Sequence, residues 1–192
     1  MQKNHHGHVL VGIGTSTGGP RALKHVIPHL QKHASYFIVQ HMPKGFTQSL
    51  AERLNVMSQL EVKEAEHGEI VRKGVVYIAP GGLHMKVVQN GLDLQIEIIN
   101  DDAESYRPSV DVLFESMSKL KDYEKIAVIM TGMGSDGTIG LKKLKASSDV
   151  TTIAQSEQSS IIFGMPKSAI EANTIDYIVD LKEIPHTIQR FI

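Results

Sequence analysis

Short apolar runs alternate with amphipathic stretches along most of this chain. Runs of this length, rich in Val and Ile, are typical of strands buried on both faces of a parallel sheet, and we assign strands to residues 9–11, 36–40, 125–130, 151–154 and 175–179. Apolar residues spaced three to four positions apart predict helices at 20–33, 46–57, 109–120, 138–146, 166–172 and 184–191. The alternation predicts an α/β fold, a doubly wound and mostly parallel sheet flanked by helices.

The segment 60–100 breaks this pattern. Its apolar runs are short and alternating, and Gly and Pro separate them. Asn90-Gly91 stands between two alternating runs, which is a strong signal for a two-residue hairpin turn. We therefore expect an antiparallel hairpin inserted into the α/β chain.

Composition narrows the class of protein. The chain has 192 residues, 41% of them hydrophobic and 21% charged, which suits one globular domain over residues 9–192 behind a flexible tail at 1–8. A formal net charge of −1 gives no overall electrostatic case for binding nucleic acid. No apolar run reaches the ~18 residues of a membrane span and the first residues lack a signal-peptide core, so we expect a cytoplasmic protein without membrane insertion.

Metal and thiol chemistry find little support in the sequence. Without cysteine the chain has no disulfide, no thiolate nucleophile and no Cys metal ligand. His25, His29 and His33 recur at helical spacing, but no acidic residue is interleaved as in a zinc-binding HExxH motif. We interpret them as a solvated helix face and expect neither a metal nor an organic cofactor.

The stretch 9–20, VLVGIGTSTGGP, carries the first chemical signal. It predicts a strand, a tight turn and a helix beginning near Pro20, with Ser16 at the apex. Three interpretations fit the turn: a G-x-S-x-G nucleophile elbow presenting Ser16, a dinucleotide-binding glycine loop, or a plain loop whose serine caps the helix.

The ends of two later strands favour the nucleophile. A dinucleotide site needs an acid about 20 residues on, whereas here the second strand ends in His41. Neighbouring parallel strands end at one sheet edge, so Ser16 and His41 should face each other. Asp136 follows a third strand in a Gly-rich turn and is the candidate carboxylate, although it could instead cap the next helix, with Asp111 as the rival acid. The order Ser, His, Asp differs from that of α/β-hydrolases.

Six motifs together extend these observations to nearly the whole chain. They are GIGTSTGGP, VQHMP, VYIAPGGLHM, RPSVDVLFES, MTGMGSDGTIGL and IIFGMPKSA, in this order. The set resembles the catalytic domain of the CheB-type chemotaxis protein-glutamate methylesterases. The resemblance implies a serine hydrolase that demethylates glutamate methyl esters, and deamidates particular glutamines, on the cytoplasmic helices of chemoreceptors.

The same resemblance implies roles for individual residues. Ser16, His41 and Asp136 match the family's triad, and Thr17 and Met133 match positions beside it. Arg107 and His84 are further candidates for substrate binding, against surface or structural roles. A receiver domain usually precedes this family's catalytic domain, whereas eight residues precede the first strand here. An excised domain, a stand-alone homologue acting on another methylated protein, a non-catalytic receptor-binding regulator and a nucleotide-binding α/β module remain alternatives.

Overall fold

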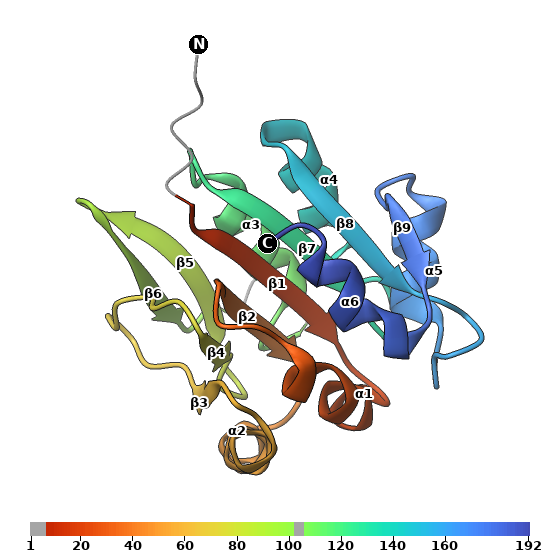
Figure 1. Cartoon of the computed structure of the whole chain (residues 1–192), viewed down its shortest axis with the longest axis horizontal. Coiled ribbons are helices and arrows are strands. Elements are labelled where there is room, and N and C mark those ends of the chain that lie inside the picture. The colour runs from red at the N-terminus through yellow and green to blue at the C-terminus, as the bar shows by residue number, and fades with distance from the viewer. Residues whose placement is uncertain (1–6, 102–105) are drawn as a thin grey trace.

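The strand β1 (Val9–Thr15) lies near the middle of a seven-stranded parallel sheet in the computed structural model, which describes residues 7–101 and 106–192 (Figure 1). The strand order is β3-β4-β2-β1-β7-β8-β9, and every pairing is parallel. The other strands are β2 (Ala34–Gln40), β3 (Glu61–Glu64), β4 (Val75–Ile78), β7 (Glu124–Ile129), β8 (Val150–Gln155) and β9 (Tyr177–Val179). The doubly wound parallel sheet expected from the sequence is confirmed.

Helices cover both faces of the sheet, and each face has its own apolar core. One core joins Val9, Val11 and Ile13 to helices α1, α2 and α6, and the other joins Leu10 to α3, α4 and α5. The helices are α1 (Gly19–Val26), α2 (Phe46–Met57), α3 (Val110–Ser118), α4 (Thr138–Ser147), α5 (Gly164–Glu171) and α6 (Ile184–Gln189). The side-chain alternation of β1 therefore feeds both cores, which explains why all of its residues are buried.

The first helix is shorter than its sequence predicted. It ends at Val26, and a 3₁₀ turn (Ile27–His29) follows, because Pro28 lacks the N–H that a continuing helix needs. His25, His29 and His33 consequently do not share one helix face. A second 3₁₀ turn (Leu181–Glu183) leads directly into α6.

Two glycines that the sequence suggested for the turn around Ser16 belong to β1 instead. A Cβ atom on Gly12 would lie 2.8 Å from Met117 Sδ and from Phe114 Cε1, and one on Gly14 would lie 2.4 Å from Val110 Cγ1. All three neighbours belong to α3. The glycines thus let α3 pack directly on the backbone of β1.

The predicted antiparallel element is confirmed, but it is smaller than the segment 60–100. The strands β5 (His84–Asn90) and β6 (Asp93–Ile99) pair antiparallel, with Asn90 opposite Asp93 around the turn, and an isolated antiparallel bridge joins Ile70 to Gln95 of β6. This hairpin forms a separate two-stranded sheet packed beside α3, while β3 and β4 extend the main sheet in parallel (Figure 1).

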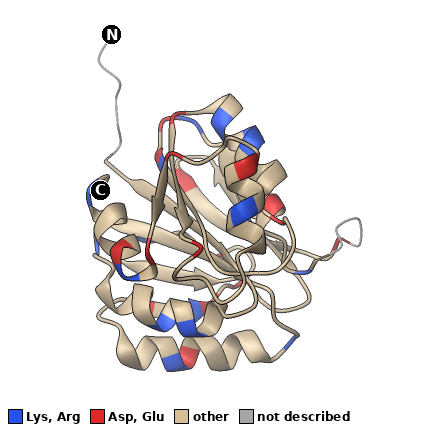
Figure 2. Ribbon diagram, turned by 90° about the vertical axis from the view of Figure 1, so that its right-hand side faces the viewer, with Lys and Arg blue, Asp and Glu red and all other residues tan. Residues whose placement is uncertain are grey.

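The chain changes its winding direction at β1. It runs from β1 to β2 and on to β4 on one side, and then returns to β7 on the other side. Ligands of open α/β sheets bind in the crevice at the carboxyl ends of strands where the order reverses, so the expected location lies beyond Thr15, Gln40 and Ile129. Charges of both signs are interspersed over the outer helices in Figure 2. Across the described residues, no helix has the length and apolarity needed to span a membrane.

Candidate active site

Three neighbouring strand ends bring Ser16, His41 and the Asp136 turn together. Thr15 pairs with Gln40 in register, so Ser16 and His41 are the next residues of adjacent strands, and the His41 N–H donates to the Thr15 carbonyl at 3.1 Å. On the other side of β1, the Ser16 N–H donates to the carbonyl of Thr131, which follows β7, at 3.0 Å. The predicted facing of serine and histidine follows from this register.

The imidazole of His41 is held by Asp136 through one nitrogen. Its Nε2 donates to Asp136 Oδ2 at 2.6 Å, and both side chains are largely buried. The other nitrogen, Nδ1, is buried and has no hydrogen-bond partner in the described part of the chain. Because Nε2 carries the proton toward the carboxylate, Nδ1 of the neutral ring has a free lone pair. In this resting geometry no hydrogen bond between described residues joins the Ser16 hydroxyl to the ring.

Asp136 is fixed by more than the histidine. Its Oδ2 also accepts from the Val110 N–H at 2.8 Å, and its Oδ1 accepts from the Ser109 hydroxyl and the Asp111 N–H at 2.9 Å each. These groups form the first turn of α3, whose own N-cap is Ser109. Asp136 therefore satisfies the open N–H groups of α3, where an anion is also favoured by the helix dipole.

This arrangement corrects the alternative in which Asp136 caps the following helix. The N-cap of α4 is Gly137, at φ 97°, with no side-chain cap. Asp111, the rival acid, accepts from the Gly140 N–H in the first turn of α4 at 2.6 Å. Burial alone would raise the pKa of Asp136, but the hydrogen bonds from His41, Val110 and Asp111 outweigh burial and hold its pKa below the ordinary value. The carboxylate is thus ionised beside His41 at neutral pH.

Gln40, which the sequence analysis did not single out, joins the backbones of Ser16 and His41. Its buried Nε2 donates to the carbonyl of Ser16 at 2.9 Å and to that of His41 at 3.1 Å. The Ser16 carbonyl also accepts from the Gly19 N–H at 2.8 Å, across Gly18 at φ 84°. Its position at the end of a buried strand, directly before His41, is the signal that could have identified Gln40.

The turn at 131–137 presses against Ser16 from the β7 side. A Cβ on Gly132 would lie 2.8 Å from Ser16 Cβ and 2.3 Å from Met165 Sδ, so only glycine fits there. The backbone N–H groups of Thr17 and Met133 donate to no acceptor within residues 7–101 and 106–192. Backbone N–H groups without an acceptor are the kind of donor that can stabilise an oxyanion.

No hydrogen bond or ion pair between described residues joins the remaining candidates, His84 and Arg107, to Ser16, His41 or Asp136. His84 is completely buried: the Ser109 N–H donates to its Nδ1 at 3.2 Å, and its Nε2 donates to the Asp101 carbonyl at 3.0 Å. With both nitrogens committed to the backbone, His84 supports the start of α3 and has no atom left for a substrate, which corrects its assignment to substrate binding. Arg107 is exposed and donates to Asn100 Oδ1 at 3.3 Å.

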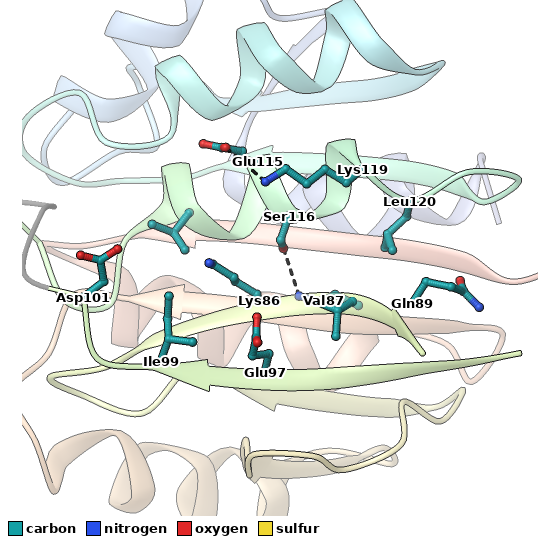
Figure 3. Close-up of a pocket in the computed structure, with 12 residues that line it drawn as sticks. Lys86, Val87, Gln89, Glu97, Ile99, Asp101, Glu115, Ser116, Lys119 and Leu120 are labelled. Carbon is teal, nitrogen blue, oxygen red and sulfur yellow. Dashed lines mark hydrogen bonds and ion pairs between the residues drawn. The ribbon is translucent and has the colours of Figure 1, made fainter. Parts of the chain in front are cut away.

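A separate groove of about 430 Å³ runs between the hairpin and α3 (Figure 3). Its walls carry charges of both signs, and the Val87 N–H donates to the Ser116 hydroxyl across it. None of the residues that line it belongs to the Ser16–His41–Asp136 site. No group of three or more His, Cys, Asp or Glu side chains with the arrangement of a metal site occurs among the described residues.

Comparison with known proteins identifies the family of this chain. The family model "CheB methylesterase" matches residues 11–188. The crystal structure of the Thermotoga maritima CheB methylesterase catalytic domain superposes with a TM-score of 0.91 at 43% identity, covering 95% of this chain and 98% of that one.

Curated relatives named protein-glutamate methylesterase/protein-glutamine glutaminase include one from Bacillus subtilis, 53% identical over 95% of this chain and 52% of its own length. Another is that of Archaeoglobus fulgidus, 46% identical over 96% of this chain and 53% of its own length. The chain thus spans about half the length of these relatives. On the strength of the family match across both sequence and fold, this chain belongs to the CheB methylesterase family.

Proposed function

We propose that this chain is a serine hydrolase that demethylates glutamate methyl esters on chemoreceptors, with Ser16 as nucleophile, His41 as base and Asp136 as its carboxylate partner. One observation carries the proposal: His41 Nδ1 is buried and has no partner among the described residues, while Nε2 donates to Asp136 at 2.6 Å. A base held in this way is ready to accept the proton of the neighbouring serine. The names of the relatives supply the class of substrate.

The first step forms an acyl-enzyme. As Ser16 Oγ attacks the ester carbonyl, its proton passes to His41 Nδ1, and the charge on the ring is balanced by Asp136, which stays ionised. The N–H groups of Thr17 and Met133 donate to the developing oxyanion. The tetrahedral intermediate then collapses, the C–O bond to the methoxy group breaks, and His41 returns the proton so that methanol leaves.

The second step reverses these roles. Water attacks the acyl carbonyl while His41 Nδ1 takes one of its protons, and the released Ser16 oxygen recovers that proton. The products are a glutamate side chain and the free enzyme. A glutamine substrate would follow the same path with ammonia as the first leaving group, which fits the second activity in the names of the relatives. No step requires a metal or an organic cofactor.

The proposed substrates are the cytoplasmic helices of methylated chemoreceptors, so we place the reaction in the cytoplasm. A glutamate ester on a helical surface must reach an open site, and Met133, beside Ser16, is 68% exposed. The exposed guanidinium of Arg107 is a candidate to attract acidic residues of such a helix. A receiver domain is the proposed regulatory partner.

Methanol release from methylated receptor membranes tests the proposal. Ser16→Ala should reduce the rate about 10³-fold or more while the protein stays folded. The matched control is Ser49→Ala, which removes an exposed hydroxyl from α2 and should change nothing. Near-normal turnover by Ser16→Ala would exclude Ser16 as nucleophile. A wild-type chain that releases no methanol but is stabilised against heat by NAD or ATP would favour the nucleotide-binding alternative.

A further inference from the structure

Tyr106 covers one face of the His41 imidazole. The two rings are stacked with centroids 4.5 Å apart and an angle of 3° between their planes. Tyr106 lies in the loop that leads to α3, and 44% of its surface is exposed. The steps derived above for Ser16, His41 and Asp136 make no use of it.

The far end of the phenol ring lies close to the turn that carries Asp136. Its hydroxyl lies over Gly134, because a Cβ built there would be 3.1 Å from the Tyr106 Oη, and Gly134 has φ 88°. Gly134 belongs to the same turn as Asp136. The ring of Tyr106 therefore reaches from His41 to the backbone of the turn that carries the carboxylate, and a side chain larger than glycine at 134 would push it away.

One hydrogen bond does not fix an imidazole ring. The bond from His41 Nε2 to Asp136 Oδ2 allows the ring to rock about the N–H···O direction, and rocking moves Nδ1 relative to Ser16. A parallel aromatic ring against one face opposes that motion. The face of an aromatic ring also attracts the positive charge that the His41 ring gains during the proposed steps.

We propose that Tyr106 is a positioning residue of this hydrolase, which holds His41 with Nδ1 toward Ser16 and stabilises the imidazolium formed in both acyl-transfer steps. The inference rests on the proposed function for its kinetic consequence, but the ring geometry itself does not. The ring of Tyr106, and not its hydroxyl, is the part that positions His41, because no described residue accepts a hydrogen bond from Tyr106 Oη.

Three variants at Tyr106 separate these roles kinetically. Tyr106→Phe keeps the stacked ring and should stay within about twofold of wild-type kcat. Tyr106→Ala should lose about threefold to tenfold in kcat, the size expected for one aromatic contact, with KM little changed. Tyr106→Leu keeps apolar bulk without a π face and should show the same loss in kcat. It replaces the alanine variant if that protein proves unstable to heat.

The matched control is Tyr123→Ala. Tyr123 also packs on a histidine, His8, with ring centroids 6.2 Å apart in an edge-on arrangement, and it precedes β7 at the opposite end of the sheet. Its removal should leave kcat unchanged.

An NMR measurement of the His41 Nε2 proton tests the positioning role without turnover. The signal of this proton should broaden or exchange faster in Tyr106→Ala and not in Tyr106→Phe.

Several results would overturn the proposal. Wild-type kcat and an unchanged Nε2 proton signal in Tyr106→Ala would remove any positioning role. A rise in KM alone would make Tyr106 a substrate contact, and an equal loss in Tyr106→Phe would assign the effect to the hydroxyl. If the wild-type chain released no methanol, the proposed function would fail, and the NMR comparison would still decide whether Tyr106 orders His41.

Discussion

Replacing Asp136 with Asn tests the centre of the site, because the structure sets the size of both effects. The carboxylate accepts four hydrogen bonds, two on each oxygen. An amide offers one oxygen, and its NH₂ must take the place of the other. If the NH₂ replaces Oδ2 it faces the Val110 N–H, and if it replaces Oδ1 it faces the Asp111 N–H. Either way, one buried backbone N–H loses its acceptor.

The expected cost in stability is about 1–3 kcal/mol, the penalty of one unsatisfied buried donor. For a chain of this size that lowers the melting temperature by about 2–10 °C. If Asp136 acted only as a helix cap, the Asn variant would keep nearly the wild-type melting temperature, since Asn caps about as well as Asp. We further expect turnover to fall about 10³–10⁴-fold at neutral pH, borrowing the scale of serine proteases, because the imidazolium loses its counter-charge and the ring can adopt the tautomer with the proton on Nδ1.

The pH dependence of stability gives an independent check. A carboxylate whose pKa is lowered on folding stabilises the native state fully above its unfolded pKa, near ~3.9, and loses this contribution as the pH falls through the lower folded value. The Asn variant has no such group. The difference in unfolding free energy between wild type and Asp136→Asn should therefore be constant near neutrality and shrink below about pH 4.

Methanol release and urea unfolding on one preparation decide the matter. The matched control is Asp176→Asn, at a carboxylate that accepts from the Thr152 N–H and hydroxyl and pairs with Lys145. Burial raises the pKa of Asp176, but these contacts outweigh burial and lower it, as hydrogen bonds do for Asp136. That variant should lose stability and keep its turnover. An Asp136→Asn protein with wild-type kcat, or one inactive only to the extent that it is unfolded, would refute the assignment of Asp136.

Three further predictions concern the surroundings of the triad. Gly132→Ala places a Cβ 2.8 Å from Ser16 Cβ and 2.3 Å from Met165 Sδ, so kcat should fall at least about tenfold, and unchanged kinetics would contradict the close packing of this turn on the nucleophile. His84→Phe removes the acceptor of the Ser109 N–H and the donor to the Asp101 carbonyl, and should cost about 1–3 kcal/mol of unfolding free energy in urea, whereas an unaltered midpoint would show that His84 is not structural. Treatment with EDTA should leave methanol release intact, and a loss that zinc restores would give a histidine such as His25 a ligand role.

The adjacency of the strand ends that carry Ser16 and His41 was accessible from the sequence for a simple geometric reason. Both residues end apolar runs, and consecutive runs joined by a helix form adjacent parallel strands whose carboxyl ends coincide. The register of Thr15 with Gln40 confirms this reasoning. The hairpin around Asn90-Gly91 was predictable in the same way, because its turn chemistry is local.

Contacts that depend on distant packing were not accessible. Gly12 and Gly14 suggested a turn, because nothing local shows that a helix about 100 residues later passes over them. The sequence offered a cap on α4, the immediate neighbour, as the alternative role of Asp136, whereas its carboxylate accepts from the first N–H groups of the distant helix α3. The histidine at 84 belongs to a motif of the family, yet its burial between the Ser109 N–H and the Asp101 carbonyl became evident only in three dimensions.

These missed contacts converge on α3. Its side chains meet four glycines, Gly12 and Gly14 in β1 and Gly137 and Gly140 at the start of α4, with Val110, Phe114 and Met117 filling the space that side chains would otherwise occupy. The helix is thereby fixed against β1 at backbone distance, and its first N–H groups are fixed with it. Since those N–H groups hold Asp136, and Asp136 holds His41, the position of the base relative to Ser16 is set by how closely α3 packs on the strand that carries Ser16. A Cβ at Gly14, 2.4 Å from Val110 Cγ1, would displace both partners of this arrangement at once, so the glycines of β1 serve the catalytic geometry although they do not form the turn around the nucleophile.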